Sequence, residues 1–169
     1  MTANRFSAAT AIGAGLLVAA GLAIGSGAAE RGVRAASDPL YVAECGSCHL
    51  AYPPGLLPAQ SWRALLGGLD DHFGDNAELD EIGRRQILAY LEENASRRKR
   101  DFGAGGDAVL RITATRHFRH EHDEIPARLV ADNPEVGSFS RCDACHADAD
   151  RGRFDEDTVR IPGHGRWDD

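Results

Sequence analysis

The sequence predicts a mainly α fold in which short helices and loops form two small, dissimilar modules. Apolar residues recur at three- and four-residue spacing in several segments, the pattern of helices with one buried face. Alternation of apolar and polar residues is nowhere sustained, so few strands are expected. The 169 residues include 19 glycines and 7 prolines, which implies many loops and short elements.

The charge of the chain argues against a nucleic-acid-binding protein. The formal net charge is -7, and charges of both signs are interspersed along the sequence. Because there is no basic stripe, the chain is not expected to bind nucleic acid. An acidic surface favours solubility and steers encounters with a positively charged partner surface.

Residues 1–29 are predicted to be an export signal peptide. No residue from Phe6 to Ala29 is charged, Arg5 precedes this run, and small residues such as Ser26 and Ala28 supply a cleavage site. The alternative is an uncleaved membrane anchor, because the run exceeds the roughly 18 residues at which a membrane span is suspected. In both cases the rest of the chain is expected in the bacterial periplasm.

All four cysteines fall in two copies of one pattern, Cys45-Gly46-Ser47-Cys48-His49 and Cys142-Asp143-Ala144-Cys145-His146. Cys-x-x-Cys-His is the attachment signature of c-type haem, in which two thiols bond to the porphyrin and the histidine becomes an axial ligand of the iron. The sequence therefore predicts two covalently bound haem c groups, with short helices and loops wrapped around them.

Two other uses of a Cys-x-x-Cys pair fit less well. A zinc site made of two such pairs would have roughly 15 to 20 residues between them, whereas these pairs lie in opposite halves of the chain. Redox disulfides would account for the cysteines of an exported protein. Neither use explains why a histidine follows directly in both copies.

Each six-coordinate iron needs a second axial ligand, commonly methionine or histidine. The only methionine is Met1, so histidine remains. In the first half, a helix would place His72 on its apolar face, and we expect His72 to bind the first iron. The apolar residues that share this spacing are Trp62, Leu65, Leu66, Leu69 and Phe73. The alternative is a buried structural histidine. Gly67 and Gly68 weaken this helix by roughly 1 kcal/mol each relative to alanine.

A further helix is predicted from about Glu78 to Asn94, capped by Asn76. The inward-facing stripe is expected to be Leu79, Ile82, Gln86, Tyr90 and Leu91. Basic residues then continue to Arg100 and form a solvated helix end, and residues 102–106 are expected to be a flexible joint. The predicted modules are residues 37–100 and 101–169.

A third helix is predicted from Ile112 to Ile125, where a proline stops it. At about 100° per residue, His122 shares a stripe with apolar residues, whereas His117 and His120 project to the opposite side. We therefore prefer His122 as the second ligand of the second iron. His117 and His120 suit a solvated basic face better. His164, in a Pro-Gly-His-Gly turn, is the next candidate, and all three histidines stay open as alternatives.

With these residues in place, the sequence resembles the dihaem cytochrome c family of bacterial periplasmic electron carriers. The most characteristic segments are His72-Phe73-Gly74-Asp75-Asn76-Ala77, His122-Asp123-Glu124-Ile125-Pro126 and Val136-Gly137-Ser138-Phe139-Ser140-Arg141-Cys142. The resemblance covers most of the exported chain. It implies bis-histidine ligation of both haems and low reduction potentials. It also implies electron transfer between a membrane cytochrome b and a soluble acceptor, which in some relatives is a small oxygen-binding cytochrome.

We therefore expect an electron carrier, not an enzyme. Methionine ligation raises the potential of a cytochrome c, so its absence independently favours low potentials. The alternative is a dihaem peroxidase or small-molecule reductase, which needs one iron with a displaceable ligand and polar groups nearby. The chain has enough histidines to fill both irons, which favours the carrier. A sensing module whose ligand displaces one histidine is a third class, without specific support.

Overall fold

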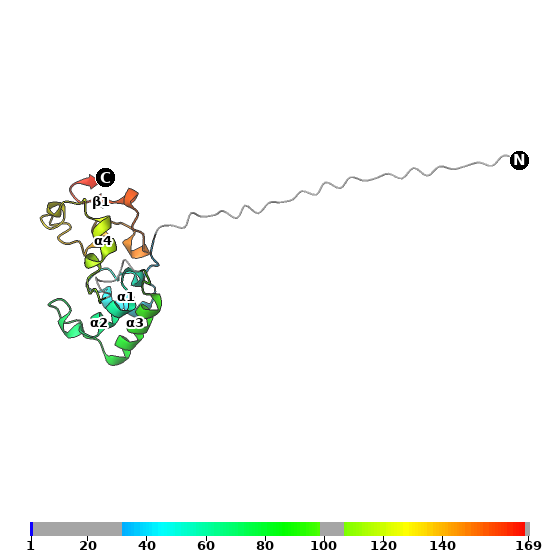
Figure 1. Ribbon diagram of the computed structural model, residues 1–169, viewed down its shortest axis with the longest axis vertical. Helices are drawn as coiled ribbons and strands as arrows, with labels where there is room; N and C mark the ends of the chain where they lie inside the picture. Colours follow the sequence, from blue (N-terminus) through cyan, green and yellow to red (C-terminus); the bar gives the residue numbers. More distant parts are fainter. Residues whose placement is uncertain (2–31, 99–106, 168–169) are drawn as a thin grey trace.

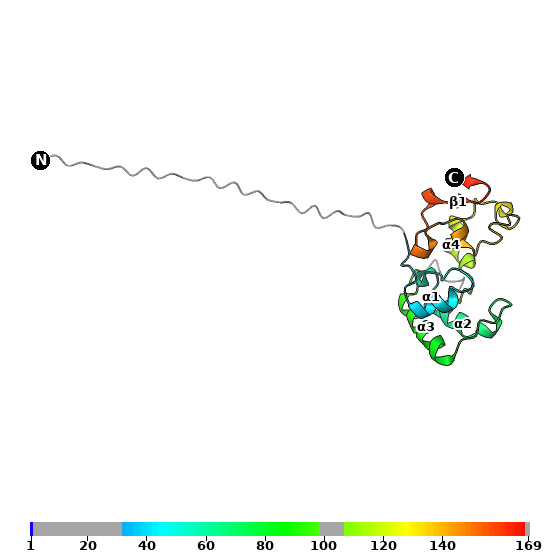
Figure 2. The same ribbon diagram turned by 180° about the vertical axis from the view of Figure 1, so that it is seen from behind.

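The computed structural model describes Met1 and residues 32–98 and 107–167, and the chain forms two lobes. Helices α1, α2 and α3 lie together at one end, and α4 lies with the short strand β1 at the other (Figures 1 and 2). The described residues are mainly helical, so the predicted mainly α fold is confirmed. The rest of the predicted export signal and the predicted joint at 102–106 lie outside the described residues.

Within residues 32–98 and 107–167, no helix has the length and apolar character that crossing a membrane requires.

The first lobe packs three α-helices around one apolar core. They are α1 (Pro39–Cys45), α2 (Ala59–Leu66) and α3 (Glu81–Asn94), joined by the 3-10 turns η1 (Pro54–Leu56) and η2 (Leu69–Asp71). The buried core residues are Tyr41, Leu57, Trp62, Leu66, Leu69, Ile87 and Leu91. Their burial away from water is the main favourable contribution to the stability of this lobe.

Helix α1 begins where the sequence caps it. The Asp38 carboxylate accepts a hydrogen bond from the Tyr41 backbone N–H at 2.9 Å, and Pro39 occupies the first helical position. Both features favour helix initiation, because the cap satisfies an otherwise unpaired N–H and proline needs none there. Helix α1 is thus seven residues long and ends at Cys45, which opens the first haem motif.

The helix expected to place Trp62 and His72 on one face is interrupted at the two glycines. Helix α2 ends at Leu66, its C-cap is Gly67, and the chain resumes as the short turn η2 before His72. Two consecutive glycines stop the helix because each costs about 1 kcal/mol relative to alanine in a helix interior. His72 is therefore presented by a turn and not by a helical face.

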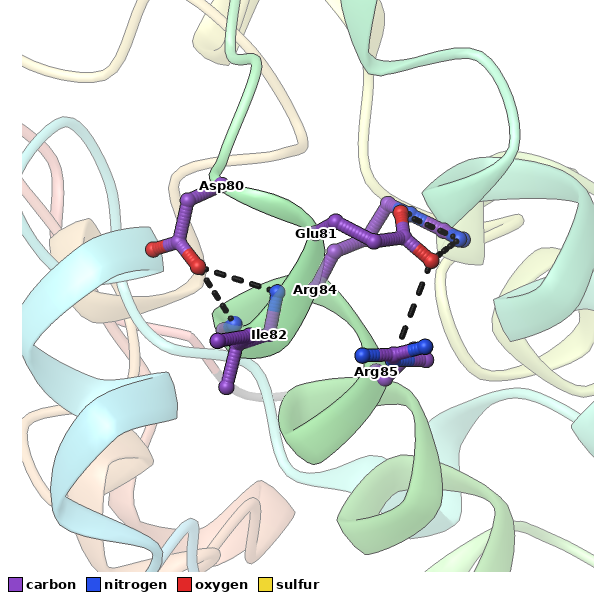
Figure 3. Close-up of polar contacts among 6 residues, drawn as sticks. Asp80, Glu81, Ile82, Arg84 and Arg85 are labelled. Carbon is purple, nitrogen blue, oxygen red and sulfur yellow. Dashed lines mark hydrogen bonds and ion pairs between the residues drawn. The ribbon is translucent and has the colours of Figure 1, made fainter.

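Helix α3 begins at Glu81, and its N-cap is Asp80, not Asn76 as predicted. The Asp80 carboxylate accepts hydrogen bonds from the N–H groups of Ile82 and Gly83, and Glu81 pairs with Arg84 (Figure 3). The predicted inward stripe is partly wrong, because Ile82 is 72% exposed and Gln86 is exposed. The fully buried residues of this helix are Ile87 and Leu91.

The second lobe has little regular structure. It consists of the helix α4 (Arg116–Glu121), an antiparallel pair of two-residue strands, β1 (Arg160–Ile161) and β2 (Gly165–Arg166), and short 3-10 turns. These turns are η5 (Ile112–Ala114), η6 (Ala127–Leu129), η7 (Cys142–Ala144), η8 (Ala149–Arg151) and η9 (Glu156–Thr158).

The helix predicted from Ile112 to Ile125 is shorter than expected. Thr115 interrupts it with extended backbone and caps α4 by accepting the N–H of Phe118 on its hydroxyl at 3.1 Å. A threonine hydroxyl competes for backbone partners in this way, which makes it a better cap than helix interior. The helix ends at Glu121, so His122 lies just beyond it.

The N-terminal residues 32–38 form a strap that contacts both lobes. The Val33 N–H donates to the Gly152 carbonyl at 3.0 Å in the second lobe, and Arg34 donates to the Asn94 side chain at the end of α3. Gly152 has a φ of 73°, and a Cβ there would lie 2.0 Å from the Val33 oxygen, so only glycine fits.

Candidate haem sites

The first Cys-x-x-Cys-His segment folds tightly against the end of α1. The Gly46 N–H donates to the Val42 carbonyl at 3.0 Å, and a Cβ at Gly46 would lie 2.2 Å from that oxygen. The Ser47 hydroxyl donates to the Glu44 carbonyl at 2.8 Å. Glycine at the second position of the motif is therefore a requirement of this close backbone approach.

The first site brings together His49 and His72, the two histidines expected there. Their ring centres are 6.3 Å apart and their planes are inclined by 23°. The His49 Nδ1–H donates to the Leu50 carbonyl at 2.7 Å, and in the neutral ring this tautomer leaves Nε2 as the nitrogen with a free lone pair. His49 can therefore present a lone pair to a metal.

The separation of the two rings is the spacing that a single iron requires. Imidazole nitrogen binds first-row transition metals at about 2.0 Å, and that nitrogen lies about 1.1 Å from its ring centre, so two imidazoles on opposite sides of one iron have centres about 6.2 Å apart. The first site, at 6.3 Å, fits an iron held between the two rings.

His72 is held by a strained turn. The His72 N–H donates to the Asp75 carbonyl at 2.7 Å, and between them Phe73 has a φ of 60° and Gly74 a φ of 105°. The Asp71 carboxylate accepts the Gly74 N–H at 3.0 Å and steadies the turn. A non-glycine residue with positive φ is uncommon, and such strain often accompanies functional sites.

Burial lowers the pKa of His72, and the neighbouring His49 ring acts in the same direction. Asp75 opposes this effect, whereas the Arg111 guanidinium adds to it. The neutral form of His72 is therefore favoured at neutral pH, and neutral imidazole is the form that binds metals.

The second motif forms its own turn. The 3-10 turn η7 contains Cys142, and the His146 N–H donates to the Cys142 carbonyl at 2.8 Å. The Cys145 carbonyl accepts the N–H of Arg160 in β1 at 3.1 Å, so the small sheet supports the motif. Burial lowers the pKa of His146 to about 4, and its Nδ1 is buried without a hydrogen-bond partner among the described residues.

The second site brings together His122 and His146. Their ring centres are 6.2 Å apart, again the spacing that one iron requires, but the planes are inclined by 68°. The His122 Nδ1–H donates to the Phe118 carbonyl at 2.9 Å, and the Phe118 ring stacks on the His122 ring at 3.9 Å. Helix α4 therefore orients His122 and leaves its Nε2 free to bind a metal.

A cavity of about 550 Å³ adjoins His122. Its volume is in the usual range for cofactor pockets. Aromatic rings and arginines share its lining, an arrangement suited to a flat apolar macrocycle with acidic substituents. The lining includes Arg111, Phe118, Arg119, His122, Phe139 and Ser140.

The other histidines lie apart from these pairs. His120 is exposed, in agreement with a solvated role, whereas His117 is half-buried with its Nδ1 3.2 Å from the Glu121 carboxylate. His164 is exposed in the turn between β1 and β2, with its ring 5.9 Å from Trp167. The solvated basic face expected for α4 is thus found in part, because Arg119 lines the cavity beside His122.

The cysteines fit haem attachment better than the competing uses. None of the four is in a disulfide, and burial raises the pKa of both Cys45 and Cys142 to about 11. Redox-active cysteines instead have lowered pKa values. Among the described residues, no group of three or more His, Cys, Asp or Glu is arranged to hold a metal ion.

Sequence reasoning missed two residues that lie between the sites. Tyr52 stacks on His49 and donates from its hydroxyl to Ser140 in the second lobe. Arg111 lines the second cavity while its guanidinium lies 3.9 Å from the centre of the Phe73 ring, next to His72. The position of Tyr52, three residues after His49, was the only available signal for either residue.

Comparison with known proteins gives one family. The model of the dihaem cytochrome c family matches residues 41–154. The crystal structure of the diheme cytochrome c from Shewanella baltica OS155 is 52% identical with a TM-score of 0.68, covering 77% of this chain and 97% of that one. The diheme cytochrome c from Rhodobacter sphaeroides is 41% identical with a TM-score of 0.64, covering 72% and 100%. No curated protein sequence matches the chain.

Proposed function

The chain belongs to the dihaem cytochrome c family and carries two c-type haems, and we propose that it is a one-electron carrier with two histidines on each iron. Cys45 and Cys48 attach the first haem, and Cys142 and Cys145 attach the second. His49 with His72, and His146 with His122, are the axial ligands. His117, His120 and His164 are not assigned to iron.

The observation that carries this proposal is the spacing of the two histidine pairs. Ring centres 6.3 and 6.2 Å apart match the spacing of two imidazoles bound to one iron, so each pair would fill both axial positions. An iron with both axial positions filled favours electron transfer over binding of a small molecule. The second candidate, a peroxidase or reductase, would need one of these histidines to be displaced.

The haem supplies the reversible one-electron change of its iron. The protein residues select the ligand and hold its orientation. Carbonyl groups at Leu50 and Phe118 fix the tautomers of His49 and His122. Burial keeps His146 neutral, since its pKa of about 4 is far below physiological pH. With histidine in place of methionine, both reduction potentials are low.

The partners are other redox proteins, met in transient encounters. We propose a membrane cytochrome b as electron donor and a small soluble cytochrome as acceptor, in the periplasm. The acidic loop around His72, which contains the exposed residues Asp70, Asp71 and Asp75, and the net charge of -7 both support a redox partner with a basic docking surface. The uncharged run before residue 30 supports export to the periplasm.

A redox titration followed by optical and electron paramagnetic resonance (EPR) spectra tests the proposal. We expect two low-spin ferric signals and two midpoints below that of a His/Met cytochrome c. The two signals should differ in shape, because the imidazole planes are inclined by 23° in one site and 68° in the other. Rapid binding of carbon monoxide or peroxide by the unmodified protein would instead support the enzyme.

A further inference from the structure

We propose that Tyr52 is a positioning residue that holds the two haem sites in a fixed relation. Its ring orients His49, and its hydroxyl forms a hydrogen bond with the segment that leads into Cys142. This inference rests on the proposed function. Tyr52 lies outside both haem motifs, and the inference gives this one side chain a role in coupling the two sites.

The ring of Tyr52 limits the rotation of His49. The two ring centres are 4.8 Å apart and the planes are inclined by 23°, close to a stacked arrangement. On its edge, His49 is held by the hydrogen bond from Nδ1 to the Leu50 carbonyl at 2.7 Å. A stacked face and an anchored edge together fix the direction of the imidazole plane.

The hydroxyl of Tyr52 reaches the other lobe. It donates to the Ser140 carbonyl at 2.7 Å, across 88 positions of sequence. The Cys142 sulfur lies 3.8 Å from the same carbonyl oxygen. A single side chain therefore contacts an expected ligand of the first iron and the segment that begins the attachment of the second haem.

The backbone of Tyr52 is itself restrained by its neighbours. Its carbonyl accepts the hydroxyl of Tyr41 at 2.8 Å, and Tyr41 is only 2% exposed in the core of the first lobe. Pro53 and Pro54 follow immediately and are fully buried, which restricts the backbone on that side. Burial raises the pKa of Tyr52 to about 12, so its hydroxyl keeps its proton and stays a donor at physiological pH.

A fixed relation between the sites matters because electron transfer between two centres is sensitive to small changes in their distance and orientation. When the carrier equilibrates internally, one iron loses an electron and the other gains it, and no proton or bond is exchanged at Tyr52. The contribution of Tyr52 is positional, since it restrains both sites through contacts present before the transfer.

Two substitutions separate the roles of the ring and the hydroxyl. Tyr52→Phe keeps the ring on His49 but removes the bond to Ser140, and Tyr52→Leu removes both. The matched control is Tyr90→Phe, which also removes one tyrosine hydroxyl, here the acceptor of the Ser37 N–H in the first lobe. The holoproteins are compared by EPR of each haem and by rapid-freeze EPR after a brief pulse of limiting reductant.

We expect Tyr52→Phe to preserve the EPR signal of the first haem while electron equilibration between the haems slows several-fold. Tyr52→Leu should in addition change the EPR signal of the first haem, and Tyr90→Phe should change neither property. An unchanged equilibration rate in Tyr52→Phe, or equal slowing in Tyr90→Phe, overturns the inference. The proposed function fails separately, if the unsubstituted protein lacks two low-spin signals.

Discussion

The two lobes of the molecule are built on different principles. The first has three α-helices around seven buried apolar residues that include Tyr41 and Trp62. The second has one six-residue helix and two-residue strands, and its buried apolar residues are Val130, Val136, Ala149, Val159 and Ile161. Small side chains bury little apolar area, so the protein part of the second lobe gains much less stability from burial.

The two lobes depend unequally on their cofactor. A small domain without an adequate core needs a staple such as a disulfide, a metal or a bound group. The second lobe has no disulfide, and its residues line a pocket of about 550 Å³ beside His122. We infer that haem completes the core of the second lobe, whereas the first lobe has its own.

The histidine pairs differ in a complementary way. In the first site the motif histidine, His49, donates to a carbonyl, whereas in the second site it is the other histidine, His122, that does so. The motif histidine of the second site, His146, has a buried Nδ1 without a partner among the described residues. The sites also differ in charge, since an acidic loop presents His72 and arginines line the cavity beside His122.

The largest expected effect follows from preventing haem attachment in one lobe at a time. In Cys142→Ser/Cys145→Ser, we expect the second lobe to lose its structure and become sensitive to protease, because its core is incomplete. In Cys45→Ser/Cys48→Ser, the first lobe should keep most of its helical circular dichroism. Limited proteolysis with mass spectrometry maps the cleavages. Equal sensitivity of the two lobes to protease would contradict the unequal dependence on haem.

Removing the second ligand of each iron is the next largest change. His72→Ala and His122→Ala should each convert about half of the iron to high spin, and a different haem in each case. Added imidazole should restore the low-spin spectrum at lower concentration in His72→Ala, because His72 lies in an exposed loop while Phe118 and Phe139 cover His122. His120→Ala is the control on α4 and should leave both spectra unchanged.

A smaller effect is expected from charge in the second site. Arg119 lines the cavity beside His122, and its positive charge favours the reduced iron. Replacing it in Arg119→Gln should lower the midpoint of the second haem by about 20 mV and leave the first unchanged. Redox titration by EPR measures both midpoints, and Arg85→Gln on α3 serves as the control. An equal decrease at both haems would show that the charge is not local to one site.

The smallest effect is expected at the exposed first site. The Asp75 carboxylate lies in the loop that presents His72, where its negative charge favours the oxidised iron. Asp75→Asn should therefore raise the midpoint of the first haem by about 10 mV, because solvent screens an exposed charge. The increase should shrink as salt is added. A decrease, or a rise that persists at high ionic strength, would argue against this sign and cause.

Local sequence patterns predicted the chemistry of the sites better than their architecture. The two Cys-x-x-Cys-His motifs are identified by residue identity and spacing alone. His72 and His122 were predicted from apolar helical stripes, but α2 and α4 each end before the histidine is reached. The supporting helices were predicted too long, since Gly67 and Gly68 end α2 and the Thr115 hydroxyl breaks the segment before α4. The spacing of apolar residues indicates which face of a helix is buried. It carries little information on the residue at which capping ends the helix.

Contacts between the lobes could not be predicted from sequence patterns. The hydrogen bond of Tyr52 to Ser140 and the contact of Arg111 with Phe73 join residues that are far apart along the chain. Such pairs have no periodicity, and each residue has an ordinary solvated or core role available to it. They become visible only when the lobes are placed side by side in three dimensions.

The strap at residues 32–38 has a consequence for the order in which the molecule matures. Val33 lies near the start of the described residues, yet the carbonyl that accepts its N–H belongs to Gly152, near the end of the chain. Contacts of such long range form late, after the cost of closing a large loop has been met. We expect the strap to dock last, after both lobes have formed.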